Sequence, residues 1–325
     1  MSVPLLSVSD LKVHFPVRGG VLLRSVASCK AVDGVSFTLG RGETLGVIGE
    51  SGCGKTTLGK AIVRLLQPTS GSIVLEGEAL GRATGKARRQ QARDFQMIFQ
   101  DPAESLNPRQ TVGDIIAEAF VVQGLGTPVE RRAWVAALLE KVGLPTSAAR
   151  KFPFEFSGGQ RQRIGIARAI ALKPKLIVCD EPVSALDVSV QGQVLNLLMD
   201  LQKEMGLSYL FISHNLAVVK HVSDRLAIMY LGKIMEMGPA EEIYRHPRHA
   251  YTRALISAIP EANPAVVVDR VRLTGDVPSP ISPPPGCAFG HRVQAPRYAE
   301  SLKHPIGLKE ITPGHFVADC PCCAI

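Results

Sequence analysis

Residues 49–56, with the sequence GESGCGKT, fit the pattern G-x-x-x-x-G-K-[ST] of a phosphate-binding loop at every position. In such a loop the glycines let successive backbone N–H groups turn inward around a polyphosphate, where side chains would block the approach. Lys55 can reach the β- and γ-phosphates, and the hydroxyl of Thr56 can coordinate Mg²⁺. The loop therefore predicts that the chain binds the polyphosphate of a nucleotide.

The segments on either side of this loop have the patterns of a strand and a helix. Residues 43–49 form a mostly apolar run that predicts a buried strand. Residues 57–67 carry apolar side chains at helical spacing, and Pro68 follows as a helix stop. The helix would direct its N-terminus at the bound anion, which favours phosphate binding over a chance match to the pattern.

An acidic pair ends a second apolar run. Residues 176–181 (LIVCDE) predict a central parallel strand whose C-terminal end opens onto a ligand. Asp180 is placed to hold Mg²⁺, directly or through water, and Glu181 is a candidate base for the attacking water. The alternative is a strand that simply ends in solvated acids. The phosphate loop upstream favours the catalytic interpretation.

The sequence SGGQ at residues 157–160 stands at the expected start of a helix that runs to Leu172, before Pro174. Exposed N–H groups and a hydroxyl at a helix start can bind an anion. A Ser-Gly-Gly turn alone is common. Its position shortly before the acidic pair, in a chain with a phosphate loop, makes it a specific signal for a second part of the nucleotide site.

Bulk composition sets broad limits on the class of protein. With 325 residues and 46% apolar content, the chain can form one large domain or two smaller ones. No stretch approaches the ~18 apolar residues of a membrane span, and the N-terminus lacks a secretory pattern, which predicts a cytoplasmic protein. The net charge of +8 fits ordinary surface charge. The basic stretch 82–93 has no interleaved aromatics, so we expect a solvated face and no nucleic-acid partner.

Together these motifs resemble the nucleotide-binding subunit of an ATP-binding cassette (ABC) transporter. Further motifs of that family follow in the expected order. Gln100 matches its Q-loop glutamine, residues 184–187 (SALD) match its D-loop, and His214 matches its switch histidine. Strand and helix patterns also alternate along the chain, as in an α/β fold. Six motifs in one order carry far more weight than any of them alone.

The resemblance implies an α/β fold built from several parts. A P-loop NTPase core of the RecA-like type would carry an antiparallel β subdomain and an inserted α-helical subdomain, followed by a small C-terminal extension. We expect the nucleotide-binding domain at residues 1–262, with the helical subdomain at about residues 101–156, and the extension at residues 263–325. Residues 111–123 and 128–142 show helical spacing of apolar side chains within the insertion.

The resemblance also assigns roles to individual residues, with ATP and Mg²⁺ as cofactors. The residues that would bind the nucleotide of this chain are Gly49, Glu50, Ser51, Gly52, Cys53, Gly54, Lys55, Thr56 and Thr57. Those that would close over a partner's nucleotide are Ser157, Gly158, Gly159, Gln160 and Asp187. Those that would serve Mg²⁺ are Thr56, Gln100 and Asp180, and those that would act in hydrolysis are Glu181, His214 and Gln100. Because two such domains pack head to tail in that family, hydrolysis would require a partner chain.

Within the family, the chain is similar to the ATPases of dipeptide, oligopeptide and nickel importers. Residues 99–109, 30–37 and 246–255 carry this similarity, as does the extension from Leu273. It implies a peripheral protein at the cytoplasmic face of the bacterial plasma membrane that powers solute import, with peptide favoured as the cargo. The implied partners are a second ATPase subunit, two transmembrane permease subunits and an extracytoplasmic substrate-binding protein. A heterodimer of ATPases is expected, and a homodimer stays open.

The main alternative is a soluble cytoplasmic ABC ATPase without a permease, such as a component of phosphonate degradation. It would share the ATP motifs and much of the sequence around Gln100. The extension from Leu273 favours the importer, because the resemblance there is to importers. Translation and DNA-repair members fit less well, since the chain has a single phosphate loop and no sustained heptads.

The chain departs from the family pattern where an aromatic ring usually stacks on adenine. The matching stretch, residues 24–29 (RSVASC), contains no aromatic residue. Phe15 is the nearest earlier one, and an insertion separates it from that stretch. The sequence therefore leaves the adenine contact unassigned.

The cysteines of the extension raise the question of a metal. In some members of the subfamily, four cysteines of the extension bind an iron–sulfur cluster. Cys287 and Cys320 would match the first and last of these, but the stretch 291–300 lacks the middle two. Cys322 and Cys323 would make an unusual substitute. We therefore expect reduced, unligated thiols rather than an iron–sulfur cluster or a structural zinc ion.

Overall fold

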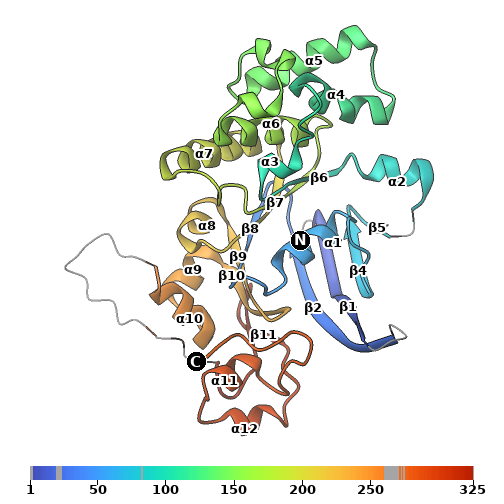
Figure 1. Cartoon of the computed structure of the whole chain (residues 1–325). Coiled ribbons are helices and arrows are strands. Elements are labelled where there is room, and N and C mark those ends of the chain that lie inside the picture. The colour runs from blue at the N-terminus through green and yellow to red at the C-terminus, as the bar shows by residue number, and fades with distance from the viewer. Residues whose placement is uncertain are drawn as a thin grey trace, which may run out of the picture. The chain divides into compact units, whose positions relative to one another are not determined.

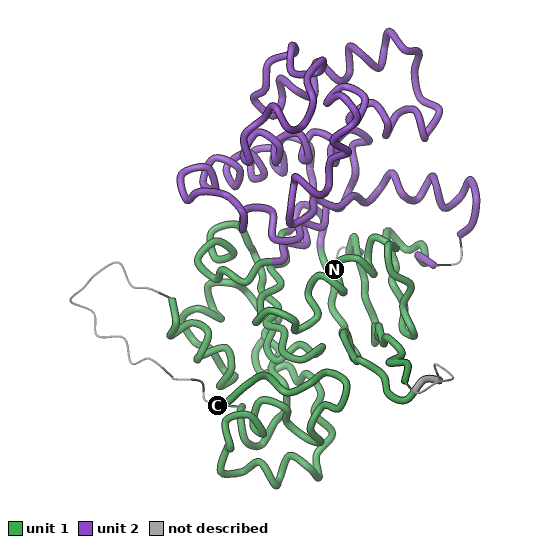
Figure 2. Tube along the Cα trace, viewed as in Figure 1, with its two compact units in different colours: residues 1–39, 44–79, 213–325 green, residues 40–43, 80–212 purple. Residues whose placement is uncertain are grey.

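A computed structural model describes residues 3–19, 24–81, 83–259, 271, 273 and 275–324. The chain separates into two compact units (Figure 2). Unit 1 comprises residues 1–39, 44–79 and 213–325, and unit 2 comprises residues 40–43 and 80–212. The expected domain boundary at residues 262 and 263 lies outside the described residues and stays a prediction.

Unit 1 contains an antiparallel sheet with the strand order β2-β1-β4-β5 (Figure 1). Its strands are β1 (Leu6–Gly19), β2 (Arg24–Leu39), β4 (Ser70–Leu75) and β5 (Glu78–Leu80). Side chains of β1 alternate between buried and more exposed positions over much of its length, as expected for a strand with one face on the core. The register pairs Leu6 with Leu39 and Phe15 with Cys29, with several irregularities between.

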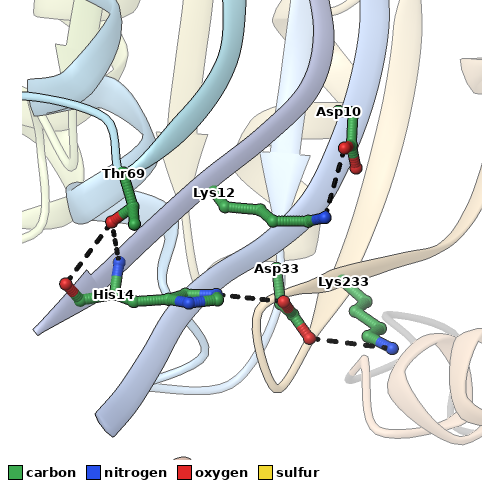
Figure 3. Close-up of polar contacts among 6 residues, drawn as sticks. All are labelled: Asp10, Lys12, His14, Asp33, Thr69 and Lys233. Carbon is green, nitrogen blue, oxygen red and sulfur yellow. Dashed lines mark hydrogen bonds and ion pairs between the residues drawn. The ribbon is translucent and has the colours of Figure 1, made fainter.

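Polar contacts tie this sheet to neighbouring segments of unit 1 (Figure 3). The ring nitrogen Nε2 of His14 lies 3.0 Å from a carboxylate oxygen of Asp33, and Lys233 lies 3.9 Å from the other oxygen of that carboxylate. The backbone N–H of His14 donates to the hydroxyl of Thr69 at 2.9 Å. The N–H of Asp33 donates to the carbonyl of Gly232 at 2.9 Å. These bonds link β1 and β2 to the second sheet of the unit.

The second sheet of unit 1 has the order β11-β12-β10-β9-β3. Its strands are β3 (Thr44–Ile48), β9 (Arg225–Tyr230), β10 (Lys233–Pro239), β11 (Leu308–Thr312) and β12 (His315–Ala318). β3 pairs with β9 in parallel, whereas β9, β10, β12 and β11 pair in an antiparallel manner. Every residue of β3 is buried, as expected for a central parallel strand.

The helices of unit 1 are short. They are α1 (Lys55–Ile62), α8 (Leu216–Val222), α9 (Ala240–Arg245), α10 (Ala250–Ser257), α11 (Ala288–Arg292) and α12 (Tyr298–Ser301). The apolar spacing predicts a first helix over residues 57–67, but α1 ends at Ile62. The reason is Arg64, which adopts a left-handed backbone with φ of +58° and turns the chain there. Leu65 is consequently 57% exposed instead of covering the core.

Unit 2 contains parallel strands in the order β8-β7-β6. They are β6 (Phe95–Ile98), β7 (Leu176–Asp180) and β8 (Ser208–Ser213). The helical segments are α2 (Gly85–Gln91), α3 (Pro102–Ser105), α4 (Val112–Gln123), α5 (Pro128–Lys141), η1 (Thr146–Arg150), η2 (Pro153–Glu155), α6 (Gly158–Ile170) and α7 (Val188–Met205). The basic stretch expected to be a solvated face forms α2, in which no described side chain is buried.

Local sequence explains the two helices expected between residues 101 and 156. Thr127 begins α5 through a capping box with Glu130, and Pro128 occupies the first helical position. Gly124 ends α4 with φ of +68°, a conformation that glycine adopts without steric cost. The rings of Phe120 and Trp134 meet edge to face at 5.0 Å and pack the two helices together.

The architecture confirms the expected fold class. A parallel strand core, an antiparallel β subdomain and an inserted group of helices are all present, and a small extension follows α10. Among the described residues, none of the helices has both the length and the apolar character needed to cross a membrane.

Candidate nucleotide-binding site

The phosphate loop, residues 49–56, connects β3 to α1 in unit 1. Two of its glycines are required by close packing of the backbone. A Cβ on Gly49 would lie 2.1 Å from the carbonyl oxygen of Met229, and one on Gly54 would lie 1.9 Å from that of Ala31. Gly52 differs, because its φ is +77° and a Cβ there would meet only open space. The loop is therefore packed tightly against neighbouring backbone at Gly49 and Gly54, which we call the clamp, and it is open at Gly52.

Lys55 is the first residue of α1 and is only 5% exposed. Its ammonium donates to two carbonyl oxygens of its own loop, that of Gly49 at 2.7 Å and that of Glu50 at 2.9 Å. Carbonyl oxygens are neutral, so they satisfy hydrogen bonds without cancelling the charge. A phosphate group would supply the missing negative charge, and the arrangement therefore fits a polyphosphate ligand.

The remaining loop residues differ in their exposure. Ser51 and Gly52 are exposed at the open side of the loop, and Thr56 and Thr57 follow Lys55 in the first turn of α1. Cys53 is buried, and burial raises the pKa of its thiol although nearby Lys55 opposes the shift. The Cys53 thiol is thus packed inside the loop and is disfavoured as a thiolate.

Glu50 is held by two residues that sequence analysis missed. Its backbone N–H donates to the hydroxyl of Tyr251 on α10 at 3.0 Å. Its carboxylate receives an N–H of Arg292 on α11, with both oxygens 2.9 Å away. The Arg292 side chain is 9% exposed and that of Glu50 is 24% exposed, so the pair is largely shielded from water. The C-terminal extension therefore contacts the phosphate loop directly through an ion pair.

Burial also raises the pKa of the Tyr251 phenol, so this group stays protonated at neutral pH and keeps a hydrogen to donate. Its ring packs against Phe289 of α11, with centroids 5.2 Å apart. No local sequence pattern could reveal either contact, because Arg292 and Tyr251 lie more than 200 positions from Glu50 along the chain.

The acidic pair lies in unit 2, at the C-terminal end of β7. Asp180 is the last residue of the strand and is 2% exposed. Glu181 follows with φ of +47°, a left-handed conformation that is strained for a residue with a side chain. Its N–H donates to the carbonyl of Ile212 at 2.9 Å, which fixes the strained turn. Such strain often marks functional positions.

Gln100 and Glu181 meet in unit 2 although 81 positions separate them. The side-chain amide of Gln100 donates to a carboxylate oxygen of Glu181 at 3.1 Å. Gln100 follows β6 and Glu181 follows β7, and the two strands pair in parallel from Phe95 with Leu176 onward. Their carboxyl ends therefore lie at one edge of the sheet, where ligands of α/β folds bind.

His214 comes one residue after β8 and is exposed. It belongs to unit 1, as does the phosphate loop. The next residue, Asn215, begins α8 and accepts hydrogen bonds from the N–H groups of Ala217 and Val218. This cap fixes the backbone turn that carries His214.

The SGGQ segment begins α6 as expected. The hydroxyl of Ser157 accepts the N–H of Gln160, and the amide oxygen of Gln160 accepts the N–H of Ser157 at 3.0 Å, so the two form a capping box. Ser157, Gly158 and Gln160 are exposed. A Cβ on Gly159 would lie 2.4 Å from the side chain of Val190, so glycine there lets α6 approach α7 closely.

Residues 184–187 lead into α7, and most of this segment is exposed. Asp187 stands at the N-cap position of α7, where its carbonyl accepts the N–H groups of Val190 and Gln191. The side chain of Gln191 donates to the carbonyl of Leu186 at 2.9 Å and holds the turn. The SGGQ segment and this turn thus present backbone and hydroxyl groups outward on unit 2.

Two family models match the chain. Residues 32–184 match the family described as ABC transporter. Residues 235–295 match the family described as oligopeptide/dipeptide transporter, C-terminal region. The first match contains the phosphate loop, the SGGQ segment and the acidic pair. The second contains Tyr251 and Arg292.

Curated relatives match the chain over nearly its full length. It is 50% identical over 319 residues to the oligopeptide transport ATP-binding protein AppF of Bacillus subtilis, covering 97% of this chain and 96% of that protein. It is 49% identical over 289 residues to the dipeptide transport ATP-binding protein DppF of Escherichia coli, covering 89% and 86%.

Solved structures share the fold at lower identity. CbiO1 from Clostridium perfringens, part of the ABC transporter complex cbiONQ, aligns with a TM-score of 0.64 at 24% identity over 75% of this chain and 92% of that one. The ATP-binding cassette MJ0796, a dimer in a post-hydrolysis state with ADP and Pi, aligns with a TM-score of 0.64 at 24% identity over 72% and 98%.

The Arg292–Glu50 pair gives a testable prediction for the loop. Replacing Arg292 with Ala should weaken ATP binding and lower the thermal midpoint, because a hydrogen bond to a charged group is worth about 1.5–3 kcal/mol. ATP affinity and thermal unfolding of the purified chain would be measured. Arg297→Ala is the matched control, since Arg297 pairs with the exposed Glu300 in the same extension. Equal effects of the two substitutions would contradict a specific role for Arg292.

Proposed function

The chain belongs to the ATP-binding subunits of ABC transporters, in the group of the oligopeptide and dipeptide importers, and we propose that it hydrolyses ATP to power peptide import through a membrane permease. One observation carries the proposal: identity of about half extends along 97% of the chain, through the C-terminal region that this importer group shares. That region also favours the importer over a soluble ATPase without a permease.

The phosphate loop supplies the nucleotide-binding half of the proposed mechanism. The open cradle at Gly52 and the buried ammonium of Lys55 fit the polyphosphate of ATP. Thr56 and Asp180 are the proposed ligands of Mg²⁺, which when bound neutralises charge on the β- and γ-phosphates. The clamped backbone at Gly49 and Gly54 keeps the loop ready for the ligand, so little ordering is required on binding.

Residues of the sheet edge supply the proposed hydrolytic half. Glu181 would take a proton from the attacking water, and its left-handed backbone sets the direction in which its side chain leaves the chain. The amide of Gln100, bonded to that carboxylate, would orient the water and contact Mg²⁺. His214 would donate to the γ-phosphate, and the capped turn at Asn215 holds its backbone in place.

The exposed SGGQ segment supports a site shared between two ATPase chains. Ser157, Gly158 and Gln160 face outward at the start of α6, where their N–H groups and hydroxyl can bind a phosphate held by another chain. Asp187 lies in the same exposed part of unit 2. We propose closure of this surface over a partner's nucleotide when ATP is bound and opening after hydrolysis. The partner is proposed to be a related second subunit.

The helical part of unit 2 is the proposed docking surface for the permease. It exposes large apolar side chains, among them Val121, Val122 and Phe154. The rings of Phe152 and Phe154 stack 5.7 Å apart just before the SGGQ segment. A permease segment bound there would sense closure of the ATPase dimer. The chain would then be peripheral, at the cytoplasmic face of the plasma membrane, with a substrate-binding protein on the other side.

Strand pairing identifies a candidate for the adenine contact. Phe15 pairs with Cys29 across the sheet and is 40% exposed. Cys29 belongs to the stretch 24–29, where the family pattern places an aromatic ring. Two positions from Cys29, the carbonyl of Ala31 packs against Gly54 of the phosphate loop. We propose that Phe15 supplies the ring that stacks on adenine.

The base assignment predicts a separation of binding from hydrolysis. Replacing Glu181 with Gln should leave ATP affinity within a few-fold of wild type while hydrolysis falls about 10²–10⁴-fold. Binding would be measured with labelled nucleotide and turnover by phosphate release from the membrane complex. Glu140→Gln, on the exposed face of α5, is the control. Near-normal turnover of the Glu181 variant would contradict the assignment.

If Phe15 stacks on adenine, its loss should weaken binding only of ligands that carry the base. Replacing Phe15 with Ala should weaken ATP binding about tenfold, since base–aromatic stacking is worth about 1–3 kcal/mol. Binding of inorganic triphosphate, which has no base, should not change. Phe15→Tyr keeps the ring and should retain ATP affinity. An equal loss for ATP and triphosphate would show that Phe15 acts only through folding.

The importer assignment is tested by what the chain binds in native membranes. A tagged chain would be purified in mild detergent, and co-purifying proteins would be identified by mass spectrometry. The expected partners are two multi-span permease subunits and a related ATPase. Recovery of soluble enzymes only, with the chain absent from the membrane fraction, would leave the ATPase assignment standing and overturn the transport assignment.

A further inference from the structure

Four cysteines of the C-terminal extension converge on one point in unit 1. Cys287 stands at the N-cap position of α11, and Cys320, Cys322 and Cys323 follow β12. All four Sγ atoms lie within 4.8 Å of one another. Cys320 and Cys322 lie 3.1 Å apart, Cys322 and Cys323 3.6 Å, and Cys287 and Cys323 3.7 Å. Three of the side chains are buried and Cys322 is half-buried.

A tight turn brings the three cysteines after β12 together. The N–H groups of Cys323 and Ala324 both donate to the carbonyl of Cys320, at 3.3 and 3.0 Å. The carbonyl of Cys323 in turn accepts the N–H of Ala250 at 2.8 Å, and Ala324 pairs with His249 in an isolated β-bridge. The turn is therefore fixed to α10 by backbone bonds and does not depend on contacts among the sulfur atoms.

Gly290 leaves the space that the sulfur atoms need. A Cβ at this position would lie 2.4 Å from the Sγ of Cys322 and 3.4 Å from that of Cys287. The N–H of Gly290 also donates to the Sγ of Cys287 at 3.2 Å. A backbone N–H directed at sulfur stabilises a thiolate, which is the form that binds metals.

Hydrogen bonds fix the segment before α10, whose His249 pairs with Ala324 beside the cysteine turn. The buried carboxylate of Glu236 accepts the N–H groups of Arg248 and His249 and lies 2.8 Å from a ring nitrogen of His315. His249 is fully buried, and its Nε2 has no hydrogen-bond partner among the described residues.

The spacing of the sulfur atoms distinguishes a single ion from a cluster. Four thiolates around one zinc ion at about 2.3 Å form a tetrahedron with about 3.8 Å between sulfur atoms. A four-iron cluster places each thiolate on a different iron, with an inorganic core between them, so its ligand sulfurs lie farther apart. The observed separations of 3.1 to 3.7 Å, with all four sulfur atoms within 4.8 Å of one another, lie nearer to the spacing around a single ion than to that around a cluster.

We propose that Cys287, Cys320, Cys322 and Cys323 form a structural site for one tetrahedral zinc ion. The sequence predicts reduced, unligated thiols here, but the convergence of all four sulfur atoms at one point favours a ligand site. Cys322 and Cys323 take the place of ligands that the stretch 291–300 lacks. The expectation that no iron–sulfur cluster is present stays a prediction, and the proposed site is consistent with it.

The position of the site gives the ion a structural role near the phosphate loop. Cys287 begins α11, which also carries Phe289 and Arg292. Phe289 packs against Tyr230 and Tyr251, with ring centroids 5.6 and 5.2 Å apart, and Arg292 binds Glu50. An ion that joins the turn at Cys320 to α11 would hold these contacts together. The proposal does not depend on the cargo or on transport.

The metal content of the intact chain tests the proposal first. The full chain would be purified in reducing buffer without chelator and analysed for zinc, iron and acid-labile sulfide. We expect close to one zinc per chain and no sulfide. Iron and sulfide in equal amounts would overturn the proposal in favour of a cluster. A metal-free chain with four reactive thiols in the extension, or with a disulfide among them, would also overturn it.

Cobalt and a chelator provide readouts that need no variant. Cobalt exchanged into the chain should give the intense visible absorption of a tetrahedral thiolate complex. Removing zinc with a chelator in the absence of nucleotide should lower the thermal midpoint and expose four thiols to a thiol reagent. A midpoint and thiol count that do not change on zinc removal would contradict a buried structural ion.

Variants then identify the ligands. Cys322→Ser, at the half-buried position, should weaken zinc retention against a chelator more than about tenfold. Gly290→Ala should also weaken it by crowding the sulfur of Cys322. Cys29→Ser is the matched control. Cys29 lies on β2 and is not one of the four proposed ligands, so this variant should keep the zinc. Full retention of zinc by Cys322→Ser would overturn the assigned ligand set.

Discussion

The nucleotide site depends on how closely the backbone packs against the phosphate loop. At Gly49 and Gly54 the carbonyl oxygens of Met229 and Ala31 occupy the space that a Cβ would need. This clamp fixes the loop between β3 and α1 and places the ammonium of Lys55 in a buried position. The same contact brings β2 beside the loop, which is why Phe15, paired with β2, becomes a candidate for the base. The glycines of the motif thus serve the fold as much as the ligand.

The C-terminal extension is part of this arrangement and not an appendage. Its Arg292 forms an ion pair with Glu50 of the phosphate loop. Its Pro280 contacts β2, because the carbonyl of Pro280 accepts the N–H of Lys30 at 2.9 Å. Phe289 packs against the ring of Tyr251, whose hydroxyl accepts the N–H of Glu50. A zinc ion that closes the cysteine turn onto α11 would therefore stabilise the contacts that support the loop. This gives a physical reason for an ATPase to carry such an extension.

The sequence predicts the elements whose signals are local, and it misses those made by distant residues. The loop motif, the apolar run before Asp180 and the SGGQ helix start each lie within a dozen positions, so motif and periodicity together identify them. The apolar spacing does not predict where α1 ends, because a left-handed turn at Arg64 ends the helix although apolar residues continue at helical spacing. The Arg292–Glu50 pair, the Phe15–Cys29 register and the meeting of four thiols join segments that only the folded chain brings together. The roles of the site residues in hydrolysis remain proposals.

We propose that this chain couples ATP hydrolysis to the entry of peptides. The most direct test is uptake of a labelled peptide by proteoliposomes that contain the complete complex, with ATP consumption measured in the same sample. We expect that peptide accumulates only with ATP and the substrate-binding protein, and that Lys55→Ala abolishes both uptake and hydrolysis. Full ATP hydrolysis by an intact complex, without accumulation of any di- or oligopeptide tested, would contradict it.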